Sequence, residues 1–351
     1  MYRSIQLCRA IAAVMVMLLH MAGVIASAKY FGLSGIDAPF SFGKAGVEFF
    51  FVLSGFIITF VHWNDFGYPS RLANYGKKRA IRIYPTYWMI FAAVYLVAAM
   101  TLGNTVILTP AALIKALLLL PQASPDPVIG TFAPILGVAW SLQYEVLFYV
   151  LMAVYVVSVP LGGLISVAIL ANLFACRAGL CVASAPYLQT DFVLLFGLGA
   201  LTAIFCKMRA MMNYSRALAG VGVFTFLITA LWNDVTGERL TLSYGAASAA
   251  IIVGLVKAEE GGKLKISWGW PTLLGDASYA LYLIHYPLIL MLSKISIRIG
   301  LHGLFGSIVS APVIIAACIA SAIGFHRFVE RPLLRTVTAS RKGLKVAIVR
   351  S

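Results

Sequence analysis

The chain has 351 residues, of which 61% are apolar and 11% are charged. Soluble domains carry roughly 25% charged residues, so this chain has too few to cover a surface that faces water. A soluble enzyme, a disordered tail and a small disulfide-framed protein are excluded. With a mean hydropathy of +0.94, the composition indicates an all-α polytopic membrane protein. The net charge of +15 is explained by basic residues in cytoplasmic loops rather than by binding of nucleic acid.

Ten apolar runs, bounded by charges, Pro or Gly, approach the length of about 20 residues that a membrane-spanning helix needs. We expect spans at approximately 5–27, 45–63, 83–103, 134–157, 159–176, 187–206, 216–233, 239–257, 272–294 and 305–328. The run 111–120 is too short to span and is expected to form an interfacial or re-entrant helix. No polar linker divides the chain. We therefore expect one membrane domain over 1–335 and a basic cytoplasmic tail over 336–351.

Basic residues predict the orientation of these spans. With the N-terminus inside, the cytoplasmic segments hold more than twice as many Lys and Arg residues as the outer segments, which places both termini in the cytoplasm. A cleavable signal peptide ending near residues 26–28 is the alternative for the first span, although Arg9 and His20 interrupt its apolar stretch. Cys176 and Cys181 then fall in an outer loop, where a disulfide can persist.

Ionisable side chains inside a span are costly and therefore mark candidate functional sites. Arg9 and His20 lie eleven residues apart in the first span, three helical turns plus about 20°, so both project from one face. Glu48 enters the second span at a depth comparable with His20, where a carboxylate can orient an imidazole as a general base. The alternative is structural: Arg9 extends to the inner interface, and His20 and Glu48 bond to neighbouring groups.

A basic segment precedes the third span. Arg79 and Arg82 are three residues apart, on one helical face, and both can form forked hydrogen bonds with phosphate oxygens. We interpret them as a candidate polyphosphate site at the inner face of the membrane. Alternatively, the segment only fixes the topology or binds anionic lipid.

Further polar groups lie deeper in the chain's apolar runs. Glu145 follows Trp140 and Tyr144 in a polar cluster, which belongs in a cavity rather than against lipid. His285, in the ninth span, is expected to line the same cavity. These four residues are candidate substrate-binding groups, with a structural network between helices as the alternative. No zinc-ligand spacing, phosphate-binding glycine loop or nucleophile elbow is found, so no metal is expected.

Taken together, several segments follow one another in a recognisable order. They are Leu7–Ala13 leading to His20, Gly46–Phe56, Arg79 and Arg82 before Tyr84-Pro85, Trp140–Glu145, Tyr279–Pro287 and Phe328–Leu333. This ordered set, across about residues 3–335, resembles the acyltransferase-3 family of integral membrane acyltransferases. The chain looks most like the stand-alone members that modify bacterial exopolysaccharide, the ExoZ type.

The resemblance implies transfer of an acyl group, commonly acetyl, from acyl-CoA to a sugar hydroxyl. The family's essential histidine would correspond to His20, and its arginines to Arg9, Arg79 and Arg82. Many members have aspartate where this chain has Glu48, whose longer side chain is still expected to reach a histidine. The implied partners are acetyl-CoA or another acyl-CoA, a carbohydrate or glycolipid acceptor and membrane lipid. We expect a multi-pass protein of the bacterial cytoplasmic membrane, the inner membrane.

Two other functions fit ten spans with intramembrane Arg, His and Glu. A transporter or flippase for a lipid-linked sugar would use such residues, but it would often show a repeated half, and a transporter has no need of a polyphosphate site. A scaffold subunit of a polysaccharide assembly complex would keep its function when His20 is replaced by alanine.

Overall fold

The computed structural model describes residues 2–102, 107–124, 126, 129–181, 183, 185–208, 213–237, 240–267 and 269–335. The expected tail over 336–351 lies outside these residues. In the described part of the chain the regular structure is helical, without strands. Ten of its helical segments are long and apolar enough to cross a membrane, which confirms the all-α membrane fold.

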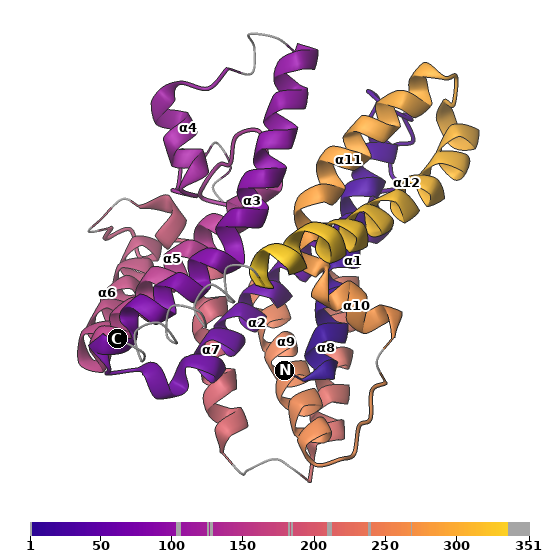
Figure 1. Ribbon diagram of the computed structural model, residues 1–351. Helices are drawn as coiled ribbons and strands as arrows, with labels where there is room; N and C mark the ends of the chain where they lie inside the picture. The colour runs from indigo at the N-terminus through magenta and orange to yellow at the C-terminus, as the bar shows by residue number, and fades with distance from the viewer. Residues whose placement is uncertain are drawn as a thin grey trace, which may run out of the picture.

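The helices of the first half of the chain are α1 (Arg3–Ala26), α2 (Ala45–His62), α3 (Leu72–Leu102), α4 (Pro110–Leu117), α5 (Trp140–Val157) and α6 (Val159–Arg177). Of these, α3, α4, α5 and α6 lie on one side of the bundle, whereas α1 lies with α10 (Trp270–Asp276) and α11 (Ser278–Arg298) (Figure 1). A 3₁₀ helix, η1 (Ala38–Lys44), leads into α2. The short run expected at 111–120 forms α4, a helix of 8 residues that begins after an N-capping threonine, Thr109.

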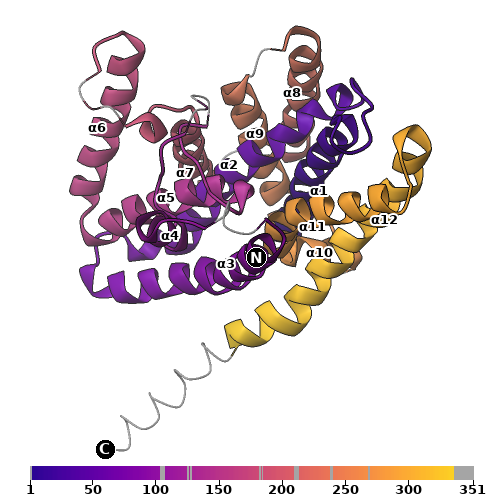
Figure 2. The same ribbon diagram turned by 90° about the horizontal axis from the view of Figure 1, so that it is seen from above.

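The second half continues with α7 (Phe192–Lys207), α8 (Ser215–Thr236), α9 (Thr241–Glu260), α10 (Trp270–Asp276), α11 (Ser278–Arg298) and α12 (Gly303–Phe325). A π-helical turn, His326–Glu330, extends α12. Seen from above, α1 and α2 lie between α5 and α6 on one side and α11 and α12 on the other (Figure 2). The most extensive contacts join α8 with α9, α2 with α7 and α11 with α12.

Small residues bring α2 and α7 into close contact. A Cβ atom at Gly55 would overlap the backbone of α7 at Phe196, and one at Gly199 would overlap the backbone of α2 at Val52. In lipid, where apolar side chains gain little by leaving the solvent, such close backbone approach is a main source of helix association. The outward faces remain apolar: Phe224 of α8 and Leu164 of α6 are 66% and 67% exposed, as expected for side chains that meet lipid.

Two boundaries differ from the expected ones, and both affect the site. Helix α3 begins at Leu72 rather than near 83, so the basic residues before the third span are helical; Lys and Arg favour helix and extend their charged ends toward water. The ninth expected span divides into α10 and α11, which meet at Ala277. Gly275 approaches the backbone of α1 at Gln6 there, and Gly and Asp at the end of α10 have low helix propensity.

Candidate active site

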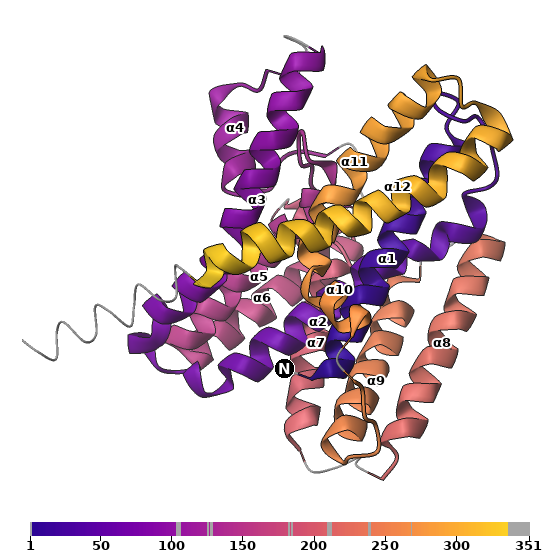
Figure 3. The same ribbon diagram turned by 45° about the vertical axis from the view of Figure 1, so that its right-hand side comes forward.

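A cavity of about 1390 Å³ opens between α1, α2, α3, α5, α10, α11 and the π-helical turn. Its interior wall is mainly apolar, with side chains such as Phe50 and Leu53 from α2, Ile83 from α3 and Leu142 from α5. Its basic residues come from the N-terminal parts of α1 and α3 and from the end of α12, which crosses toward α3 (Figure 3). They are Arg9, Lys77, Lys78, Arg79, Arg82, Arg327 and Arg331. The cavity thus combines a basic mouth with an apolar interior.

Aromatic rings and a buried carboxylate hold the two arginines of α3. The Arg79 guanidinium lies 5.6 Å from the centre of the Tyr149 ring, and its Nε is buried without a hydrogen-bond partner in the protein. The Arg82 guanidinium lies 5.4 Å from the Tyr279 ring and donates to Glu330 Oε1 at 3.2 Å. Ring faces attract the cations without using their N–H groups, so donors remain available for an anion.

Arg9 reaches the same cavity from α1. Its Nη1 donates to Gln6 Oε1 at 3.1 Å, and the Gln6 amide donates to Asp276 Oδ1 at 2.7 Å. This chain of polar contacts joins α1 to α10. The predicted cation set, Arg9, Arg79 and Arg82, is therefore brought together at one cavity.

The end of α12 contributes groups that sequence reasoning did not assign to the site. Arg327 and Arg331 line the cavity beside the predicted arginines. Glu330 is 1% exposed and its second oxygen pairs with His326 Nδ1 at 2.8 Å. The Glu-Arg-Pro sequence at 330–332 was visible as a motif, but its contact with Arg82, 248 residues away, depends on helix packing that no local pattern encodes.

Of the polar cluster in α5, only part faces the cavity. Glu145 lines it, accepting hydrogen bonds from Tyr149 Oη at 2.5 Å and Ser54 Oγ at 3.5 Å. Trp140 and Tyr144 are absent from the lining. They pack with Phe51 of α2 and Phe192 of α7, and Tyr144 Oη donates to the Ile129 carbonyl at 2.7 Å. In the structure these two rings support the cavity wall from behind.

His20 and His285 meet directly. His20 Nδ1 and His285 Nε2 are 2.9 Å apart; His285 is fully buried, while His20 is half-buried. Neither lines the large cavity, in contrast to the expectation for His285. The pair lies behind a wall formed by Tyr282 and Phe50: both residues line the cavity, and the Tyr282 ring centre is 6.0 Å from that of Phe50 and 5.9 Å from that of His285.

Glu48, the residue expected to orient His20, is fully buried in the first turn of α2. The His20 ring is hydrogen-bonded to His285 and to the backbone of Val16, one turn earlier in α1. The imidazole that sequence reasoning assigned to a substrate pocket is thus a direct partner of His20.

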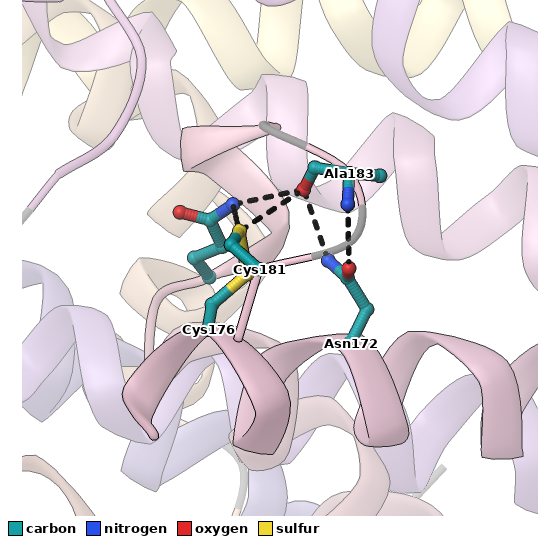
Figure 4. Close-up of a disulfide and its surroundings, with 5 residues drawn as sticks. Asn172, Cys176, Cys181 and Ala183 are labelled. Atoms are coloured by element: carbon teal, nitrogen blue, oxygen red, sulfur yellow. Dashed lines mark hydrogen bonds between the residues drawn. A yellow bond between two sulfur atoms is a disulfide. The ribbon is translucent and has the colours of Figure 1, made fainter. Parts of the chain in front are cut away.

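A disulfide that the sequence left open lies apart from the cavity. Cys176, at the end of α6, is bonded to Cys181 in the segment that follows (Figure 4). Asn172 and Gln189 hold this segment by hydrogen bonds to the backbone of Ala183. Within the described residues, no group of three or more His, Cys, Asp or Glu side chains is arranged to hold a metal ion.

Comparison with known proteins gives the family. Residues 2–327 match the sequence profile of the acyltransferase-3 family, described as an acyltransferase domain. The exopolysaccharide production protein ExoZ of Rhizobium meliloti is 28% identical over 313 residues, covering 86% of this chain and 93% of that protein. The proposed peptidoglycan O-acetyltransferase YrhL of Bacillus subtilis is 27% identical over 329 residues, which cover 83% of this chain but only 50% of the relative. No solved structure matches the chain. Because the profile matches nearly the whole chain, the protein belongs to the acyltransferase-3 family of membrane acyltransferases.

Proposed function

We propose that this protein transfers an acetyl or other short acyl group from acyl-CoA to a hydroxyl group of an exported or cell-surface polysaccharide, or of its lipid-linked precursor. The observation that carries the proposal is the cavity with seven basic residues at its mouth and a pair of histidines behind its inner wall. The relatives support the acceptor class, since one is named for exopolysaccharide production and the other for peptidoglycan O-acetylation.

The basic mouth fits the donor chemically. Coenzyme A carries a diphosphate and a 3′-phosphate at one end and the reactive thioester at the other. Arg79, Arg82, Arg327 and Arg331 present guanidinium groups, which can bind phosphate oxygens in a bidentate manner. The buried, unpartnered Nε of Arg79 is a donor that such an anion would satisfy. The apolar interior suits the extended arm between phosphates and thioester.

His20 is proposed as the general base. It lies just over three turns beyond Arg9 in α1, about 16 Å along the helix axis, and so lies deep relative to the basic mouth. His20 would accept the proton of the acceptor hydroxyl as the hydroxyl oxygen bonds to the thioester carbonyl carbon. The carbon–sulfur bond then breaks, and the imidazolium returns the proton to the thiolate. A base in this position typically accelerates such a step by about 10²–10⁴-fold.

Attack by the hydroxyl on the donor and a two-step route through acyl-His20 use the same residues. Rapid quenching in the absence of acceptor separates them. A stoichiometric acyl-His20 adduct would exclude direct transfer, and its absence at a time when complete turnover proceeds would exclude the two-step route.

We further propose that the protein resides in the bacterial cytoplasmic membrane with both termini in the cytoplasm. The excess of Lys and Arg on the segments at the α1 N-terminal side supports this orientation. The same orientation gives the basic mouth access to cytoplasmic acyl-CoA. It also places the disulfide loop after α6 on the outer side, where disulfides persist.

Release of free CoA from acetyl-CoA by the purified protein in detergent tests the proposal, with a polysaccharide–lipid fraction as acceptor. Turnover is expected to disappear in His20→Ala and to require higher donor concentrations in the double variant Arg79→Ala/Arg82→Ala. The matched control removes two exposed cations from the end of α11, Lys294→Ala/Arg298→Ala, and should behave as wild type. Full turnover in His20→Ala would refute the assigned base.

A well-folded protein that neither turns over acetyl-CoA nor binds CoA would refute the donor site as well. If the protein still binds CoA but shows no turnover, the result would refute only the assumption that the chosen fraction contains the acceptor. In that case lipid-linked oligosaccharide and peptidoglycan fragments are the next acceptors to supply.

A further inference from the structure

The ring of His20 bonds to the backbone of Val16, one turn earlier in α1, and to His285, a histidine whose other nitrogen is also engaged. His285 Nδ1 lies 2.9 Å from the carbonyl oxygen of Leu281, one turn earlier in α11. A carbonyl oxygen only accepts hydrogen bonds, so His285 Nδ1 must carry a proton. This single contact determines the protonation pattern of the pair.

Burial favours the neutral form of an imidazole, and His285 is fully buried. A neutral imidazole has one N–H and one lone pair. With its proton on Nδ1, His285 therefore offers the lone pair of Nε2 to His20. The short contact between this Nε2 and His20 Nδ1, 2.9 Å, requires His20 Nδ1 to be the donor. The remaining nitrogen of His20, Nε2, then holds an available lone pair.

We propose that His285 is the positioning residue that holds His20 as the tautomer with a basic Nε2. The inference rests on the role of His20 as base in the proposed function and adds the group that selects and orients its reactive nitrogen. The ordered contacts run from the Leu281 carbonyl through His285 to His20, each imidazole donating through Nδ1. The Tyr286 ring, whose centre lies 4.8 Å from that of His20, restricts the imidazole from a second direction.

The same contact between His285 and His20 also stabilises the imidazolium that His20 forms during the reaction. When His20 accepts a proton at Nε2, its Nδ1–H becomes a stronger donor, and the lone pair of His285 stabilises the positive charge by a charge-assisted hydrogen bond. A neutral partner at this depth supplies that stabilisation without an additional ionised side chain in the membrane, which would be costly. His285 does this without touching the cavity.

Nitrogen-15 NMR of histidine-labelled protein tests the tautomer independently of enzymatic activity. The full chain is labelled, the His20 resonances are assigned with His20→Gln, and the ring nitrogens are measured at a pH where the ring is neutral. The expected result is a protonated Nδ1 and an unprotonated Nε2 on His20. In His285→Phe this preference should be lost, whereas His285→Gln, whose amide oxygen can accept from His20 Nδ1, should retain it.

Two outcomes overturn the proposal: wild-type His20 protonated at Nε2, or an unchanged His20 tautomer in His285→Phe. If His285→Phe does not fold, the wild-type protein and His285→Gln still decide, because both must show the Nδ1–H form. The exposed His302 provides a matched control, since His302→Phe should leave the resonances of His20 unchanged.

Kinetics add a measurement that a merely structural role would not reproduce. In His285→Phe, kcat should fall by about 10- to 100-fold, the effect of losing one hydrogen bond to a group that becomes charged. The donor KM should change less than twofold, and His285→Gln should recover most of kcat. Equal losses in both variants, or a loss confined to KM, would contradict positioning. If wild-type protein transfers no acyl group at all, the proposed function fails, but the NMR result still decides the role of His285.

Discussion

Substitutions at Arg79 test the donor site directly, because they distinguish the contribution of its positive charge from that of its planar set of N–H donors. The guanidinium lies over the Tyr149 ring and its buried Nε has no protein partner. If a phosphate of CoA binds here, Arg79→Ala removes at least one charge-assisted hydrogen bond, worth about 1.5–3 kcal/mol. The dissociation constant of CoA should then rise by roughly 10- to 150-fold.

Arg79→Lys divides this loss into two parts. A lysine retains the positive charge but is a point donor that cannot reproduce the planar pair of N–H groups. We therefore expect an intermediate loss of about 1 kcal/mol, or roughly fivefold in affinity. Tyr149→Leu, which removes the ring beneath the guanidinium, should weaken binding by about 0.5–1 kcal/mol, the range of a partly exposed cation–π contact.

Equilibrium binding of CoA and of dephospho-CoA to each purified variant provides the measurement. If Arg79 contacts the 3′-phosphate, the loss in Arg79→Ala will vanish with dephospho-CoA; if it contacts the diphosphate, the loss will be the same for both ligands. Lys294→Ala/Arg298→Ala, at exposed positions of α11, controls for a general change in charge. An Arg79→Ala variant that binds both ligands within twofold of wild type would refute the assignment of this residue to the donor site.

Three further predictions concern the scaffold. Gly199→Leu should destabilise the fold by about 3 kcal/mol or prevent it from forming, because the side chain would overlap the α2 backbone. Size-exclusion profiles and thermal midpoints in detergent should show this loss. The control is Gly197→Leu, at a position with open space around it, which should behave like wild type. Cys181→Ser removes a disulfide between residues 5 apart in sequence and should cost about 2 kcal/mol of local stability. In intact cells, a membrane-impermeant maleimide should label the wild-type loop only after reduction. Labelling of the wild-type protein without a reductant would contradict the disulfide. Glu330→Ala removes a buried carboxylate that forms two hydrogen bonds and should lower the thermal midpoint by several degrees. The decrease should be smaller than that for loss of a fully buried ion pair, because Arg82 is about one-third exposed. An unchanged thermal midpoint would contradict this prediction.

The spans could be predicted from sequence because lipid imposes one strong requirement, an apolar helix of sufficient length. All ten expected runs correspond to candidate spans, and the short α4 was also anticipated. The predicted helix boundaries are wrong where the requirement for an apolar helix is weak. The start of α3 carries basic residues that extend to the interface, so hydropathy placed it about three turns too late. The break between α10 and α11 depends on a close approach to α1.

The site was only partly predictable for a related reason. Periodicity within one helix relates Arg79 to Arg82, which line the same cavity, since neighbours on a helix face are fixed by local geometry. The pairs Arg82–Glu330 and His20–His285 join residues 248 and 265 positions apart. Their formation depends on which of many similar apolar helices become neighbours, and that is decided by small-residue packing spread over the whole bundle. The contact between His20 and His285 was therefore not predicted from the sequence.

The distribution of ionisable groups follows the cost of burying charge and thereby orders the proposed reaction. The arginines and lysines of the cavity lie in the N-terminal part of α1, in α3 and at the end of α12, where water can still reach the chain. Deeper in the bundle, beyond Tyr282 and Phe50, the structure places two imidazoles bonded to each other. An imidazole pair can be neutral at rest and charged for the duration of one proton transfer, so the cost of a buried ion arises only during catalysis. On the proposed function, this separation lets a donor bind by its phosphates at one face of the membrane and deliver its acyl group to an acceptor that approaches His20 from the opposite face. Tyr282 and Phe50 form the barrier between the cavity and His20 that the thioester must pass.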